Sequence, residues 1–144
     1  MSTRRRCAGI RAAAAMLLML TGCSVVGDIW ATKDANDSVV FAVCDDFEAS
    51  ELRVRVQGVE GAAWTASGQH DFAPNETFSY GVDPSGLSTT SGPLELEATD
   101  TVVVSIMPED QTEGSSIRGV FDLDEVNSGD CLAADGRTAE DPCT

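Results

Sequence analysis

Thr101-Val102-Val103-Val104-Ser105-Ile106-Met107 gives the strongest strand signal of the sequence, because the stretch is apolar and rich in β-branched residues. Pro108 follows and ends the run, since proline cannot donate a hydrogen bond to a neighbouring strand. A second stretch, Leu52-Arg53-Val54-Arg55-Val56, alternates apolar and charged residues. The alternation predicts a strand with its aliphatic side chains against a core and both arginines toward water. The fold is therefore expected to be built from strands.

Short runs with the composition of strands recur along the chain between turn residues. The further runs cover residues 38–44, 62–66, 76–82, 94–98 and 117–123. Asp83-Pro84-Ser85-Gly86 has the residue order of a type I turn, and a Ser/Thr/Gly loop is expected from there to Gly92. Beyond Cys23 no window keeps the apolar period of an amphipathic helix.

This pattern predicts an all-β domain over residues 38–131. About seven short strands in this length are typical of an antiparallel β-sandwich, for which immunoglobulin-like topology is the first expectation. A small β-barrel is the second. The Cys, Trp, Cys spacing of true immunoglobulin domains is absent, so the expectation rests on the strand pattern alone. Residues 132–144 are expected to form a loop-like acidic tail.

The N-terminus has the layout of an export signal. Arg4, Arg5, Arg6 and Arg11 precede an uncharged run over residues 12–20, which leads into Leu20-Thr21-Gly22-Cys23. A membrane-spanning helix needs about 20 apolar residues, and this run is much shorter. The segment resembles the signal peptide of bacterial lipoproteins, whose lipobox consists of an aliphatic residue, two small residues and a cysteine. The resemblance covers only about the first 23 residues.

The resemblance implies that residues 1–22 are removed and that the Cys23 thiol and the new amino terminus are acylated. Two or more acyl chains hold a protein durably on a bilayer. We therefore expect a lipid-anchored protein on the extracytoplasmic face of the cell membrane. Residues 23–37 are expected to form a lipidated tether, with Trp30 packing against the domain rather than dipping into the headgroups.

The charge of the chain narrows the choice of partners. After removal of residues 1–22, all 24 acidic residues remain against five basic ones, so the formal charge is −19. The basic residues are Lys33, Arg53, Arg55, Arg118 and Arg137. Nucleic acid is excluded as a partner by this charge, and anionic headgroups would repel the domain, so the membrane connection should run through the acyl chains. A protein partner in the envelope is compatible with it.

Three cysteines remain once Cys7 is removed and Cys23 is lipidated. Export places Cys44, Cys131 and Cys143 in an oxidising compartment, where one disulfide and one leftover thiol can form in three ways. We expect Cys44 to pair with Cys131, because one follows a buried strand and the other lies shortly after the last strand. A bond between Cys131 and Cys143 would close only a short loop within the C-terminal tail.

Catalytic chemistry has little support in the sequence. His70 is the only histidine, no GxSxG motif occurs, and we expect His70 to lie in a solvent-facing loop. No catalytic residue, metal site or cofactor is expected. Calcium remains an alternative, because pairing of the two cysteines would bring Asp45, Asp46 and Asp130 together. Trp64 is the aromatic residue whose exposure would indicate a sugar-stacking surface.

The sequence therefore predicts a non-enzymatic binding or structural module of the cell envelope, tethered by lipid at Cys23. The alternatives are an accessory subunit of an envelope transporter or enzyme, a calcium- or solute-binding module, and a small hydrolase as the weakest. An exposed apolar patch would favour the binding module. A pocket at His70 with converging carboxylates would favour the enzyme.

Overall fold

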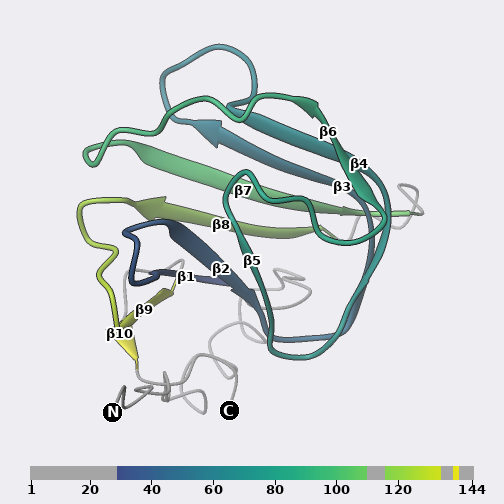
Figure 1. Ribbon diagram of the computed structural model, residues 1–144, viewed down its shortest axis with the longest axis horizontal. Coiled ribbons are helices and arrows are strands. Elements are labelled where there is room, and N and C mark those ends of the chain that lie inside the picture. The colour runs from purple at the N-terminus through teal and green to yellow at the C-terminus, as the bar shows by residue number, and fades with distance from the viewer. Residues whose placement is uncertain (1–28, 110–115, 134–137, 140–144) are drawn as a thin grey trace, which may run out of the picture.

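The computed structural model describes residues 29–109, 116–133 and 138–139. Two antiparallel sheets of five strands each pack face to face (Figure 1). The predicted all-β sandwich is confirmed, and the two sheets do not close into a barrel. The residues described contain no helix that is long and apolar enough to cross a membrane.

The first sheet has the strand order β10-β9-β1-β2-β5. Its strands are β10 (Thr138–Ala139), β9 (Cys131–Ala133), β1 (Ile29–Lys33), β2 (Val39–Val43) and β5 (Glu76–Ser79). The second sheet has the order β6-β4-β3-β7-β8. Its strands are β6 (Leu87–Ser91), β4 (Trp64–Phe72), β3 (Phe47–Val56), β7 (Thr101–Pro108) and β8 (Ile117–Asp122).

The order of the strands within each sheet resembles the expected immunoglobulin-like arrangement, but the order in which the chain visits them differs. β3, β7 and β8 occupy the positions of strands C, F and G, and β1, β2 and β5 those of A, B and E. β4 and β6 extend the second sheet beyond β3, as the additional strands of variable-type domains do. The difference is that β5 precedes β6 in the chain, so the chain visits the first sheet between these two strands.

The core lies between the sheets and follows the alternation of the sequence. Along β7 and β8 every second residue is buried, and β3 buries Leu52 and Val54 as predicted. Aromatic rings join the two inner faces: Phe41 of β2 lies 5.3 Å from Phe78 of β5 and 5.9 Å from Phe121 of β8, between ring centroids. Burial of this continuous apolar layer is the main force that stabilises the sandwich.

The sandwich begins earlier than the sequence indicates. β1 lies inside the expected tether of residues 23–37, where it pairs with β2 on one side and β9 on the other. The Asp34 carboxylate accepts hydrogen bonds from the amides of Asn36 and Ser38, which closes the turn to β2. Trp30 is buried against the domain, as predicted.

The C-terminal boundary also shifts. β9 and β10 place residues 131–133 and 138–139 in the first sheet, whereas residues 132–144 were expected to form a loop-like tail. The other residues of that tail lie outside the described part of the chain. These strands are too short to show a period in the sequence.

One predicted strand and one predicted loop exchange roles in the second sheet. Residues 94–98 form no strand, because the Asp100 carboxylate accepts the Glu97 amide and turns the chain into β7. The strand on the outer side of β4 is instead β6, which forms in the expected Ser/Thr/Gly loop. The turn before β6 is shifted by one residue from the predicted Asp83–Gly86 turn. It covers residues 84–87, because the Leu87 amide donates to the Pro84 carbonyl oxygen, and Gly86 has a φ of 86°.

Candidate functional site

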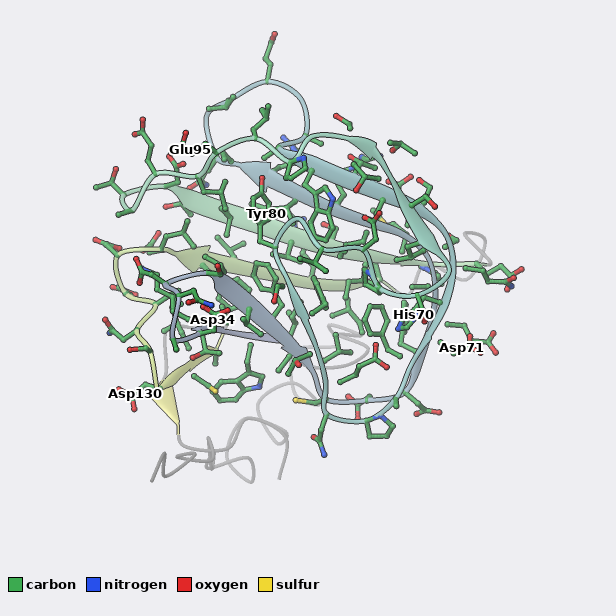
Figure 2. The ribbon with its side chains drawn as sticks, viewed as in Figure 1. Asp34, His70, Asp71, Tyr80, Glu95 and Asp130 are labelled. Carbon is green, nitrogen blue, oxygen red and sulfur yellow. The ribbon has the colours of Figure 1, made fainter. Side chains whose placement is uncertain are left out.

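His70 lies in β4, on the same side of the strand as Trp64 and Phe72. Its side chain is only 10% exposed, so the expectation of a solvent-facing loop histidine is wrong. The sequence contained the necessary signal, because period two from Trp64 to Phe72 places His70 on the core side. In Figure 2, His70 lies at one end of the sandwich, and Glu95 lies toward the other end.

The His70 ring connects three elements. Its Nδ1 lies 2.6 Å from the Ser85 carbonyl oxygen, in the turn before β6. Its Nε2 lies 2.5 Å from Glu76 Oε2, on β5 of the opposite sheet. The ring also packs edge-on against Phe72, with 4.5 Å between ring centroids. We call His70, Glu76 and Ser85 the histidine clamp, because they join the two sheets at this end.

The clamp has the composition of a hydrolytic triad but not its hydrogen bonding. A carbonyl oxygen only accepts, so Nδ1 must donate its proton to Ser85 O. Ser85 Oγ lies 3.3 Å from the same Nδ1. Because Nδ1 carries a proton, it has no free lone pair with which to accept the proton of the Ser85 hydroxyl. This geometry supports a structural role for His70 rather than activation of a nucleophile.

His70→Phe is expected to lower the free energy of unfolding by about 1–3 kcal/mol, because phenylalanine keeps the ring but leaves Ser85 O and Glu76 without their partner. Ser85→Ala is the matched control and should cost less than about 0.5 kcal/mol, since the carbonyl that accepts from His70 remains. Urea unfolding followed by tryptophan fluorescence measures both. Equal losses would show that the Ser85 hydroxyl, not its carbonyl, holds the ring.

Tyr80 closes the other end of the aromatic core. Its hydroxyl donates to the Leu94 carbonyl at 2.7 Å, and its ring meets Trp64 edge-on at 5.5 Å. Burial raises the pKa of Tyr80 above its ordinary value near 10. The protonated phenol is therefore part of the folded state.

The alkaline titration of Tyr80 can be followed without interference, because it is the only tyrosine of the chain. We expect the tyrosinate absorbance of the folded protein to appear above the pH at which it appears in urea, since the pKa is raised only in the folded state. The stability due to the protonated phenol is complete below about pH 10 and is lost as the pH rises through the folded pKa. Tyr80→Phe should remove this part of the alkaline destabilisation, and identical pH profiles of the two proteins would contradict the assignment.

The cysteines predicted to form a disulfide are both buried, and they lie with Trp30 in one apolar cluster of the first sheet. Cys44 directly follows β2, and Cys131 begins β9. The pairing of Cys44 with Cys131 stays a sequence-based prediction.

The calcium alternative depended on that pairing. Asp45 and Asp46 follow β2, whereas the Asp130 carbonyl accepts a hydrogen bond from Thr32 near the other end of β1. Figure 2 places Asp130 far from His70 and Asp71. Within residues 29–109, 116–133 and 138–139, no three His, Cys, Asp or Glu side chains are arranged to hold a metal ion. The described geometry thus gives calcium no support.

The stacking surface suggested for Trp64 is not present, because Trp64 is fully buried. Its indole nitrogen donates to Thr89 Oγ1 at 3.1 Å, and Thr89 Oγ1 lies 2.5 Å from Asp83 Oδ1. Trp64, the largest fully buried side chain among the described residues, therefore holds the edge strand β6 in place. Its role is in the core.

Exposed apolar side chains gather where two loops meet. Val82 is 62% exposed and Leu94 57% exposed. A Cβ added to Gly81 would lie 2.9 Å from the Pro93 ring, so the two loops are in contact. We call Val82, Pro93 and Leu94 the loop patch. The exposed carboxylates of Asp83 and Glu95 directly follow it in the two loops.

No protein-family model matches this chain, and neither a curated protein nor a solved structure is significantly similar to it. Cys23 and the lipobox lie outside the described residues. The function is therefore argued from the residues themselves.

Proposed function

We propose that the protein is a non-enzymatic binding module, held by lipid at Cys23 on the extracytoplasmic face of the cell membrane, that docks another protein of the cell envelope. The loop patch is the observation that carries the docking. Val82 and Leu94 are more than half exposed and lie on contacting loops, although burial of such side chains stabilises a domain. Contiguous apolar side chains with a polar border are typical of protein interaction sites.

The border of the loop patch indicates the chemistry of the partner. Asp83 and Glu95 are exposed next to it in the two loops, and neither forms an ion pair with a described residue. A partner that presents an apolar side chain among lysines or arginines would complement both the apolar loop patch and its acidic border. Such charge complementarity raises the association rate and suppresses unsuited partners.

Two observations support a module without catalysis. The histidine clamp occupies both nitrogens of the only imidazole of the chain, and one of them donates to a carbonyl. The neighbouring Gln69 side chain donates to Glu109, and the second carboxylate oxygen of Glu76 accepts from the Ala73 amide. The lipobox Leu20-Thr21-Gly22-Cys23 supports the anchor, because it follows a basic segment and a short apolar run.

The anchor is tested by metabolic labelling with an alkyne analogue of palmitate. The protein should take up the label and fractionate with membranes, whereas Cys23→Ala should remain unlabelled and appear in the soluble exported fraction. Labelling that persists in Cys23→Ala would contradict lipidation at this residue. A soluble wild-type protein would contradict the anchor itself.

The docking is tested by photo-crosslinking on intact cells with Val82→p-benzoylphenylalanine in the full-length chain. A discrete protein adduct is expected that weakens strongly when Leu94→Ser is added. Val59→Ser is the matched control, because Val59 is 54% exposed but lies in the β3–β4 loop outside the loop patch. No adduct, or equal loss in both variants, would count against the loop patch.

A further inference from the structure

The outward face of the second sheet carries arginines in a protein that is otherwise strongly acidic. β3 contributes Arg53 and Arg55, and β8 contributes Arg118. Of the four basic residues that the structure describes, only Lys33 lies elsewhere, on β1. The three arginines therefore concentrate positive charge in the middle of this face, although Glu51 and Asp122 lie on the same side of β3 and β8.

The strand registers place these side chains in two adjacent rows. Arg53 lies opposite Ser105 of β7, which lies opposite Arg118. In the next row, Val103 of β7 lies between Arg55 of β3 and Val120 of β8. We call the residues of both rows the arginine face: Arg53, Ser105, Arg118, Arg55, Val103 and Val120. The Cα atoms of Arg53 and Arg118 are about 10 Å apart, since neighbouring strands are about 4.8 Å apart.

The guanidinium groups of this face are open to a ligand. Arg53 is the only one with an ion pair among the described residues, at 2.6 Å from Glu51. Arg55 and Arg118 are exposed and make no hydrogen bond or ion pair with any described residue. In a chain with 24 acidic residues, exposed arginines without a carboxylate partner leave several donors unused.

We propose that the arginine face binds a short acidic segment of a protein partner. The planar guanidinium matches a carboxylate with two parallel hydrogen bonds, which lysine cannot do. Val120 is 40% exposed at the end of the second row, two residues from Arg118 on β8, and offers an apolar contact. Protein interfaces are enriched in arginine and depleted in lysine, aspartate and glutamate, and this face has that composition.

The charge of the whole protein selects this occupant over others. A long polyanion would extend past the three arginines and meet the surrounding carboxylates. A second copy of the chain would bring another net negative charge, −15 for the full sequence. A bilayer surface is disfavoured because none of the six residues is aromatic and the domain as a whole is repelled by anionic headgroups. A compact acidic segment fits within the face and avoids this repulsion.

The arginine face is tested with Val120→p-benzoylphenylalanine in the full-length chain on intact cells. We expect a protein adduct whose crosslinked peptide, sequenced by mass spectrometry, contains clustered aspartates and glutamates. Addition of Arg55→Gln and Arg118→Gln should lower its yield at least about fivefold, because the charged pairs across the interface are lost. Lys33→Gln should leave the yield unchanged, since it removes one positive charge outside the face.

The double variant is suited to this test because neither arginine holds the fold together. Its urea midpoint should equal that of the parent, which separates loss of binding from unfolding. The inference is overturned by the absence of a protein adduct, by an adduct that ignores the arginine variants, or by crosslinks only to lipid, glycan or a peptide without acidic residues. An adduct from Val82 with none from Val120 would overturn the arginine face alone, and the reverse would overturn only the loop patch.

Discussion

Trp64→Ala should lower the free energy of unfolding by about 3–5 kcal/mol, the range found when a large buried aromatic side chain is truncated. Trp64 is fully buried, its ring meets Phe78 and Tyr80, and its indole nitrogen donates to Thr89. The variant would therefore leave a cavity between the sheets and release the edge strand β6 at the same time. Urea unfolding measures the change.

Trp64→Phe separates these two contributions. Phenylalanine fills much of the cavity but cannot donate to Thr89, so a smaller loss of about 1–2 kcal/mol is expected. Hydrogen exchange of the β6 amides should then increase while that of β7 stays slow. A loss below about 1 kcal/mol for Trp64→Ala would contradict the placement of this ring in the core.

Gly86→Ala should cost about 3–5 kcal/mol, because two backbone segments approach each other at this glycine. Gly86 has a φ of 86°, and an added Cβ would lie 2.0 Å from the Gln69 carbonyl oxygen. The turn before β6 would have to move away from β4. Since Ser85 precedes Gly86, this movement would also break the contact between Ser85 O and His70.

Gly58→Ala is the matched control for the backbone conformation. Gly58 has a φ of 83°, almost the same as Gly86, but nothing lies within 4 Å of an added Cβ. The control should cost only about 1–2 kcal/mol, the penalty of a left-handed conformation without a clash. Equal losses in urea unfolding would show that conformation, and not the close approach to β4, makes Gly86 necessary.

The sequence revealed the strands whose burial follows a period, and these make up most of the core. β2, β3, β7 and β8 lie where apolar runs or alternation predicted them. β6 could not be found in this way because only Leu87 of its five residues is apolar and buried. It is held instead by Asp83, which accepts from the Thr89 amide, a contact set by the turn before it.

The surfaces depend on pairing between distant parts of the chain. Alternation predicted that Arg53 and Arg55 face water, but only the register of β7 with both neighbours places Arg118 in the same row. The loop patch likewise requires that Gly81 and Pro93 meet. Registers and loop contacts of this kind are set by the packing of the whole sandwich, which a local period does not encode.

The position of β1 determines how the sandwich would respond to a pull through the anchor proposed at Cys23. Only residues 24–28 separate Cys23 from Ile29, so the two residues are at most about 22 Å apart when this segment is fully extended. Tension on this segment would act along β1, which is hydrogen-bonded to β2 over five register pairs and to β9 on its other side. Hydrogen bonds perpendicular to the strands would resist such a load together, in shear, rather than open one after another. The strand next to the proposed anchor is therefore the one whose pairing best resists such a load.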